Sequence, residues 1–370
     1  MNFRKILSQF DYLLIVIVLI IFSVGLLTIA SATDFMNLGI TREVKMQVVA
    51  FSLGIAAIIL LQFINYEIFG MFYKSIYVLG ILLLLLVYVP GLGVVREGSR
   101  RWIDIGLINI QTSELAKLAY ILFYAKFLEK IGGIKGIKEI FKSLLVLAPY
   151  LVLVLKQPDL GTSLVFVFVT FGMMLVSGLK YRYVVLGVGT LGIAMPFIYP
   201  RLENHQRVRI DAFLNPEDLS LPGNYQVLQS KITIGSGRMY GKGLFEGVYH
   251  RLNYLPVQES DFIFAVFVEE TGFVGGLALI SMYFFFLMRM IHLSRKTKDD
   301  FGSYAIIGIT FMFAFQIIEN IAMTMGKLPV TGITLPFFSY GATAVLTSML
   351  AIGLVETIYL RRQKGTFTHF

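Results

Sequence analysis

Long apolar runs constrain the fold of this chain more than any other feature of its sequence. They recur from residue 12 to residue 359, and each approaches the ~20 mostly apolar residues that a helix needs to cross a bilayer. Hydrophobic residues make up 56% of the 370 residues and charged residues only 15%, whereas soluble domains carry about 25% charged residues. The chain has no cysteine, which excludes disulfides and thiolate chemistry. We therefore expect a polytopic membrane protein.

The runs predict an all-α fold with about ten transmembrane helices in one integral membrane domain over residues 1–370. The predicted spans are 12–31, 46–64, 71–90, 113–128, 142–156, 160–178, 183–200, 261–291, 303–324 and 337–359. The first is interpreted as a retained helix, because its run of about 18 residues is longer than the core of a signal peptide. The fourth is the least apolar, since it carries Glu114, Lys117 and Lys126.

The net charge of +9 follows the positive-inside rule when the N-terminus is placed in the cytoplasm. The N-terminus then carries Arg4 and Lys5, and the C-terminal tail carries Arg361, Arg362 and Lys364. Alternate connections carry the other basic clusters, which are Lys74; Lys130, Lys135, Lys138 and Lys142; Lys180 and Arg182; and Arg295, Lys296 and Lys298. Both termini are thus predicted to be cytoplasmic. No soluble basic domain interleaved with aromatic residues is present, so we expect no nucleic-acid partner.

Two predicted outer segments, 91–112 and 201–260, also carry cations. Long loops cross membranes largely regardless of charge, so tolerance is one explanation. The other is that these cations hold an anionic ligand at the outer surface. The segment 201–260 is too long for a simple connection and too apolar for disorder. We expect it to be a large, ordered extracytoplasmic loop between helices 7 and 8, with short helices over the bundle.

Arginine pairs in these outer segments are candidate phosphate ligands. Arg100 and Arg101 lie in GSRRWI, and Arg207 and Arg209 lie in QRVRI. A planar guanidinium binds phosphate oxygens through two parallel hydrogen bonds. The alternative for the first pair is contact with lipid headgroups, beside Trp102 in an aromatic belt.

Three acidic motifs lie at predicted span ends, where ionisable groups are functional candidates by default. Glu114 and Lys117 share a helix face, and the plain alternative is an ion pair at a helix start capped by Ser113. Asp159 either caps the sixth helix or holds an acid at a cavity. Asp261, at the head of the eighth span, is either a helix-dipole acid or a general base at the membrane–water boundary.

Together these segments resemble the SEDS family, which includes the RodA, FtsW and SpoVE proteins. The matching segments are GSRRWIDIG at 98–106, SELAKLA at 113–119, KQPDLGTS at 156–163, NHQRVRIDAFLNP at 204–216, NYQVLQSKITIGSG at 224–237, YGKGLFEG at 240–247, LPVQESDFIFAVFVEETG at 255–272 and LPVTGITLPFFSYG at 328–341. The RodA branch is the better match, because the chain lacks long terminal extensions. The chain departs from the family pattern at Arg238, where glycine is expected, at Glu259-Ser260, where many members have His-Thr, and at 342–344.

The resemblance implies a bacterial plasma (inner) membrane protein with peptidoglycan glycosyltransferase activity on the outer face. The implied substrate is lipid II, an undecaprenyl-pyrophosphate-linked disaccharide-pentapeptide, and the implied partner is a class B penicillin-binding protein, a transpeptidase. Asp261 matches the family's essential acid. The expected substrate-binding residues are Arg100, Arg101, Glu114, Lys117, Asp159, Arg207, Arg209 and Gln226.

This set suggests an inverting polymerisation of lipid II during cell-wall elongation and cell-shape maintenance, with Asp261 as general base and undecaprenyl pyrophosphate as leaving group. The scheme needs no cofactor. A divalent cation such as Mg²⁺ or Mn²⁺ is compatible with it, although no spacing of ligands defines a metal site. Two alternatives stay open: a flippase or transporter for lipid II, and a non-catalytic scaffold that activates a partner synthase. The clustering of candidates toward one face favours chemistry at the surface.

Overall fold

The computed structural model describes residues 10–33, 36, 39–96, 99–104, 106, 109–248, 255 and 257–362. Arg4, Lys5 and Lys364, which helped to orient the termini, lie outside this part of the chain.

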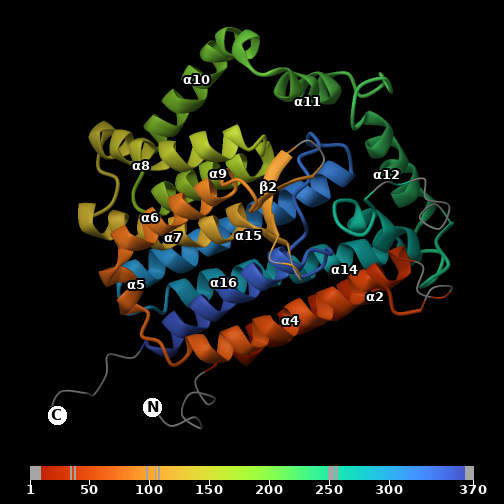
Figure 1. Cartoon of the computed structure of the whole chain (residues 1–370), viewed down its shortest axis with the longest axis horizontal. Helices are drawn as coiled ribbons and strands as arrows, with labels where there is room; N and C mark the ends of the chain where they lie inside the picture. The colour runs from red at the N-terminus through yellow and green to blue at the C-terminus, as the bar shows by residue number, and fades with distance from the viewer. Residues whose placement is uncertain are drawn as a thin grey trace.

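Antiparallel helices form most of the molecule and run back and forth through one bundle (Figure 1). They are α2 (Tyr12–Ala32), α4 (Arg42–Leu61), α5 (Glu67–Met71), α6 (Tyr73–Leu86), α7 (Thr112–Ile131), α8 (Ile137–Lys156), α9 (Leu160–Val176), α10 (Tyr181–Ile198), α11 (Asn204–Leu214), α12 (Asn224–Ser236), α14 (Ile263–Ser294), α15 (Asp300–Thr324) and α16 (Ala342–Leu360). Five of these, α2, α4, α14, α15 and α16, are long and apolar enough to cross a membrane, and α6, α9 and α10 contain shorter apolar helices. Each predicted span overlaps one long helix, with ends that differ by up to five residues, and the span 71–90 also includes Met71 at the end of α5.

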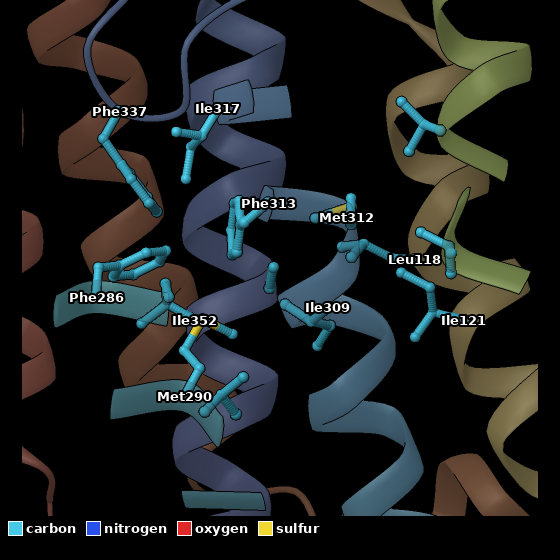
Figure 2. Packing of buried hydrophobic residues seen from close by; sticks show 14 of the residues in the cluster. Leu118, Ile121, Phe286, Met290, Ile309, Met312, Phe313, Ile317, Phe337 and Ile352 are labelled. Atoms are coloured by element: carbon cyan, nitrogen blue, oxygen red, sulfur yellow. The ribbon is translucent and has the colours of Figure 1, made fainter. Parts of the chain in front are cut away.

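Helix α15 lies at the centre of the bundle and packs against α7, α9 and α14. Figure 2 shows Phe313 of α15 beside Phe286 of α14 and Phe337, whose ring centroids lie 5.3 and 5.5 Å from its own. Leu118 and Ile121 of α7 lie on the other side of α15. Lipid tails are as apolar as these side chains, so close van der Waals packing holds such helices together.

The prediction of a mostly helical fold is confirmed, and the structure adds a three-stranded antiparallel sheet that was not predicted. Its strands are β1 (Gly93–Arg96), β2 (Ser99–Asp104) and β3 (Asn109–Gln111), in the order β1-β2-β3. Trp102 of β2 pairs with Val94 on one side and with Gln111 on the other. These strands are only three to six residues long and contain no long apolar run. A prediction based on long apolar runs therefore assigns the segment to a loop. The Thr343 hydroxyl donates to the Asn109 carbonyl over 2.8 Å and ties the sheet to the start of α16.

Residues 181–236 form an arch beside the bundle (Figure 1). Helix α10 leaves the body, α11 crosses over it, and α12 returns to pack against α14 and α15. The two helices α11 and α12 lie in the segment 201–260, where short helices were expected. Tyr249 and Arg251 of that segment lie outside the described residues.

The eighth predicted span is interrupted at Gly272, whose φ of 72° and ψ of −170° are not helical. Its backbone lies against the glycine-rich segment that follows α12, where Gly241 and Gly243 have the positive φ values expected of turns. A Cβ at Gly272 would lie 2.3 Å from the Gly241 nitrogen and 2.5 Å from the Met239 oxygen. The bend therefore requires glycine, both for its backbone angles and for its contacts.

Gly272→Ala is expected to lower the melting temperature of the detergent-solubilised protein strongly, with a loss of about 3 kcal/mol or more, because this backbone region is nearly closed to other residues. The matched control is Gly235→Ala in α12, where a Cβ meets open space. That change is expected to be neutral or slightly stabilising. Equal melting temperatures for the two variants would contradict the assigned bend.

Candidate active site

A cavity of about 540 Å³, here called the central cavity, opens at one end of the bundle. It lies where α7, α9, α14 and α16 begin and α15 ends, under the sheet and the arch. Most of the predicted site residues line it: Asp261, Arg101, Glu114, Lys117, Asp159, Arg209 and Gln226. These seven residues come from six separate segments of the sequence, which thus meet around one space.

Two predicted residues are not among the described residues that line this cavity. The Arg100 side chain lies outside the described part of the structure. Arg207 does not line the cavity, and its guanidinium donates to the Pro200 carbonyl instead. Arg207 and Arg209 are two positions apart in α11, which places them about 200° apart around a helix. They cannot both face the cavity, and of this pair only Arg209 lines it.

The backbone of Asp261 is held by α15 and by the loop that follows it. Asn320 Nδ2 donates to the carbonyl oxygens of Asp261 over 2.9 Å and of Ile333 over 2.8 Å. The Ser260 hydroxyl donates to Asp261 Oδ1 over 2.9 Å. A Cβ at Gly332 would lie 3.3 Å from Asp261 Oδ2, so the carboxylate lies against a glycine backbone. These contacts fix a half-buried carboxylate on the cavity wall.

Asp261 is not a helix cap. The N-cap of α14 is Phe262, and the cap makes no side-chain hydrogen bond. Asp261 directly precedes this cap, so it lies at the positive end of the helix dipole without forming a capping hydrogen bond. Its carboxylate also lines the central cavity.

Asp159 caps α9, as the sequence suggested, and it also lines the cavity. Its Oδ1 accepts from the Thr162 backbone nitrogen over 3.0 Å, and Oδ2 accepts from the Thr162 hydroxyl over 2.9 Å. Arg101 Nη1 lies 3.6 Å from Asp159 Oδ1. Arg101 also donates to the carbonyl oxygens of Gln157, over 3.2 Å, and Pro158. Arg101 thus uses much of its hydrogen-bond donor capacity on the turn that connects α8 to α9.

Glu114 and Lys117 form a buried ion pair on the first turns of α7, with Nζ and Oε1 2.7 Å apart. Only 3% of the Lys117 side chain and 10% of the Glu114 side chain are exposed. The expected cap at Ser113 was wrong, because α7 begins at Thr112 after Gln111. A charge pair kept this far from water is stable only while both partners remain.

Arg209 is the cation with the least compensation in the cavity. It forms no ion pair within 4 Å among the described residues, and its Nη1 is buried without a hydrogen-bond partner there. Burial, followed by the nearby Arg101, lowers the pKa of the Arg209 guanidinium, while Asp159, Glu319 and Asp261 raise it. A buried donor without a partner is costly, which makes Arg209 the best anion ligand at this site.

Several cavity residues were missed in the sequence. Thr331, Gln316, Thr343 and Glu259 line the wall. Just behind it, the buried Glu319 accepts a hydrogen bond from the Thr331 hydroxyl. Glu319 could have been found in the sequence, because it is an acid within the apolar stretch 303–324. The hydroxyl and amide residues carry no such signal.

The described residues contain no group of three His, Asp or Glu side chains that could hold a metal ion. Among the cavity acids, Glu114 is paired with Lys117, Asp159 accepts from Thr162 and Asp261 accepts from Ser260. The described residues thus form no preformed metal site, and no step is assigned to a metal ion.

Comparison with known proteins identifies the family of this chain. The family model for FtsW, RodA and SpoVE, described as "Cell cycle protein", matches residues 11–364. The chain is 35% identical to stage V sporulation protein E of Bacillus subtilis, over 94% of this chain and 96% of that protein. It is 32% identical to peptidoglycan glycosyltransferase MrdB of Escherichia coli K12, over 95% of this chain and 93% of that protein.

A solved structure described as "Structural coordination of polymerization and crosslinking by a peptidoglycan synthase complex" contains a chain that superposes with a TM-score of 0.83. That chain is 30% identical, and the match covers 96% of this chain and 99% of the other. The family model, the relatives and the superposition span nearly the same residues. The chain therefore belongs to the SEDS family of peptidoglycan glycosyltransferases, with FtsW, RodA and SpoVE.

Proposed function

We propose that the protein polymerises lipid II into glycan strands and that Asp261 is the general base. The observation that carries this proposal is the meeting in one cavity of a fixed carboxylate, Asp261, and a half-buried cation, Arg209, which forms no ion pair among the described residues. A sugar hydroxyl is a poor nucleophile, and a carboxylate that takes its proton in the transition state accelerates attack by about 10²–10⁴-fold.

In the proposed reaction, the 4-hydroxyl oxygen of the acceptor sugar attacks C1 of the donor muramyl unit. The new C–O bond forms as the bond from C1 to the diphosphate oxygen breaks. The proton passes to Asp261, and undecaprenyl diphosphate leaves with the bonding electrons. One displacement inverts the α-linked donor into a β-linked product, so no covalent intermediate with the protein is needed.

Arg209 is placed to stabilise the charge that grows on the leaving diphosphate. Arg101 and Lys117 also line the cavity, but each is neutralised by an acid of its own. Preorganised positive charge is worth most where it is not already paired and is shielded from water. Glu114, Asp159 and Gln226 then serve to shape the polar wall and orient the sugars.

The membrane arrangement belongs to the same proposal. We infer ten spans in one integral domain, with both termini in the cytoplasm and the central cavity on the outer face of a bacterial inner membrane. The segment 201–260 would then be extracytoplasmic. Basic residues such as Lys135 and Lys298 lie at the opposite end of the bundle from the cavity, in agreement with the positive-inside rule.

A class B penicillin-binding protein is the proposed partner, and elongation with shape maintenance is the proposed cellular role. The partner proposal is supported by the superposition on a chain of a peptidoglycan synthase complex. The elongation role rests on the sequence resemblance to RodA. Restoration of rod shape in cells depleted of their own RodA, without restoration of division in cells depleted of FtsW, would support it.

The test of the function is polymer formation from purified lipid II by the reconstituted protein, with and without the partner. Glycan strands that form only when this protein is present are the expected result. Transfer of labelled lipid II across proteoliposomes without polymer would favour a flippase instead. Polymer made by the partner with an inactive form of this chain would favour a scaffold.

A further inference from the structure

A second cavity of about 230 Å³, here called the side cavity, lies next to the central cavity. It is bounded by α11, α12 and the turn that follows α15. Arg209 and Val330 line both cavities, so together they form the partition between them. A ligand in the side cavity would therefore lie within one side chain of the proposed reaction site.

The two cavities differ in charge. Glu114, Asp159, Glu259 and Asp261 all line the central cavity. No described residue lining the side cavity is acidic, and its ionisable members are Arg209 and Lys327. The side cavity therefore selects for an anion, whereas the central cavity holds charges of both signs.

Neither cation of the side cavity is neutralised within the described structure. Arg209 has a buried Nη1 without a partner. Lys327 is exposed and forms no ion pair among the described residues. Two cations that line one cavity, one half-buried and one exposed, fit the two oxygens of a single anionic group.

The remaining walls are mostly apolar. They include Phe213, Pro222, Val227 and Pro329, with Asn224 as the one neutral polar side chain among the described lining residues. Asn224 Nδ2 is already used on the carbonyl oxygens of Asn215 and Asp218, over 2.8 and 2.9 Å. A sugar would leave its hydroxyls unpaired here, and a diphosphate would leave most of its oxygens unpaired. A ligand with a carboxylate and small apolar groups would match both the two cations and the apolar residues of the side cavity.

We propose that the side cavity is a subsite for the carboxyl terminus of the peptide carried by the substrate. This inference rests on the proposed function, because the peptide is part of lipid II. The terminal carboxylate contacts Lys327 and Arg209, and the small side chains of the last residues lie against the apolar walls. The subsite binds the end of the peptide while the sugars occupy the central cavity. It thereby selects precursors whose peptide is complete.

The first test compares Lys327→Gln with the control Lys231→Gln on two substrates, lipid II and the same lipid-linked disaccharide without its peptide. Lys231 is an exposed lysine of α12 that lines neither cavity. Loss of a charged hydrogen bond corresponds to roughly a tenfold change in affinity. We expect Lys327→Gln to raise KM about tenfold for lipid II and to leave KM for the peptide-free substrate and both kcat values unchanged. Lys231→Gln is expected to change neither KM.

An equal rise in KM for both substrates would overturn the peptide assignment and point to a phosphate of the lipid carrier as the ligand. No rise with either substrate would remove the subsite. If the wild-type protein polymerises neither substrate, the proposed function fails, and a binding measurement still decides the subsite.

That measurement titrates the free pentapeptide, its C-terminal amide and inorganic phosphate into wild-type protein and Lys327→Gln. The acid is expected to bind wild type roughly tenfold more tightly than the amide does, and Lys327→Gln is expected to abolish the difference. Equal binding of acid and amide to wild type would contradict the proposal. Lysine-dependent binding of phosphate alone would contradict it as well.

Discussion

Asp261→Asn is expected to lower kcat for lipid II polymerisation by about three orders of magnitude, within the range that a general base contributes. The amide has nearly the shape of the carboxylate but cannot accept the proton of the attacking hydroxyl. The backbone contact from Asn320 does not depend on the side chain of residue 261. The variant is therefore expected to fold and to melt like wild type, and substrate binding should change little.

Ser260→Ala is the matched control for this result. It removes the hydroxyl that donates to Asp261 Oδ1 but keeps the base, so we expect a loss of activity of about tenfold or less, as for one hydrogen bond. Polymer gels and release of undecaprenyl diphosphate measure both variants. Activity of Asp261→Asn close to that of Ser260→Ala would remove Asp261 from the role of base.

Lys117→Met is expected to destabilise the protein by about 3–5 kcal/mol, because it leaves the carboxylate of Glu114 buried without its partner. The methionine fills a similar volume, so the loss arises from the unpaired charge rather than from a void. Thermal unfolding in detergent measures the change. A melting temperature equal to that of wild type would contradict the buried pair.

The double variant Glu114→Gln with Lys117→Met separates stability from function. It removes both charges, and replacing a buried pair by neutral residues is often close to neutral for stability. We expect it to recover most of the melting temperature but little of the polymerisation activity, since the polar wall of the cavity stays altered. Full recovery of activity would assign the pair to folding alone.

The main architecture could be predicted from the sequence, because each membrane helix must satisfy its backbone within one apolar segment. The cap at Asp159 could be predicted for a similar reason, since an acid three residues before Thr162 is a local signal. The sheet at 93–111 could not, because short strands leave no such run. Gly272 shows the same limit, since the apolar sequence continues through the bend.

The site could be predicted as a set of residues but not as an arrangement. In the sequence, the cations of the outer segments are equivalent candidates for phosphate ligands. In the structure, Arg101 contacts Asp159 and nearby carbonyl oxygens, and Lys117 is paired with Glu114. Arg207 turns away because helical geometry separates it from Arg209. Only the fold reveals that Arg209 forms no ion pair among the described residues and that it separates two cavities.

The most direct test of the account is a structure of the Asp261→Asn variant with lipid II bound in a membrane mimic. The account predicts an acceptor 4-hydroxyl about 3 Å from the side chain of residue 261, the distance that proton transfer requires, and the donor diphosphate beside Arg209. Density for the sugars or the diphosphate outside the central cavity, for example along the exposed face of α10, would contradict it.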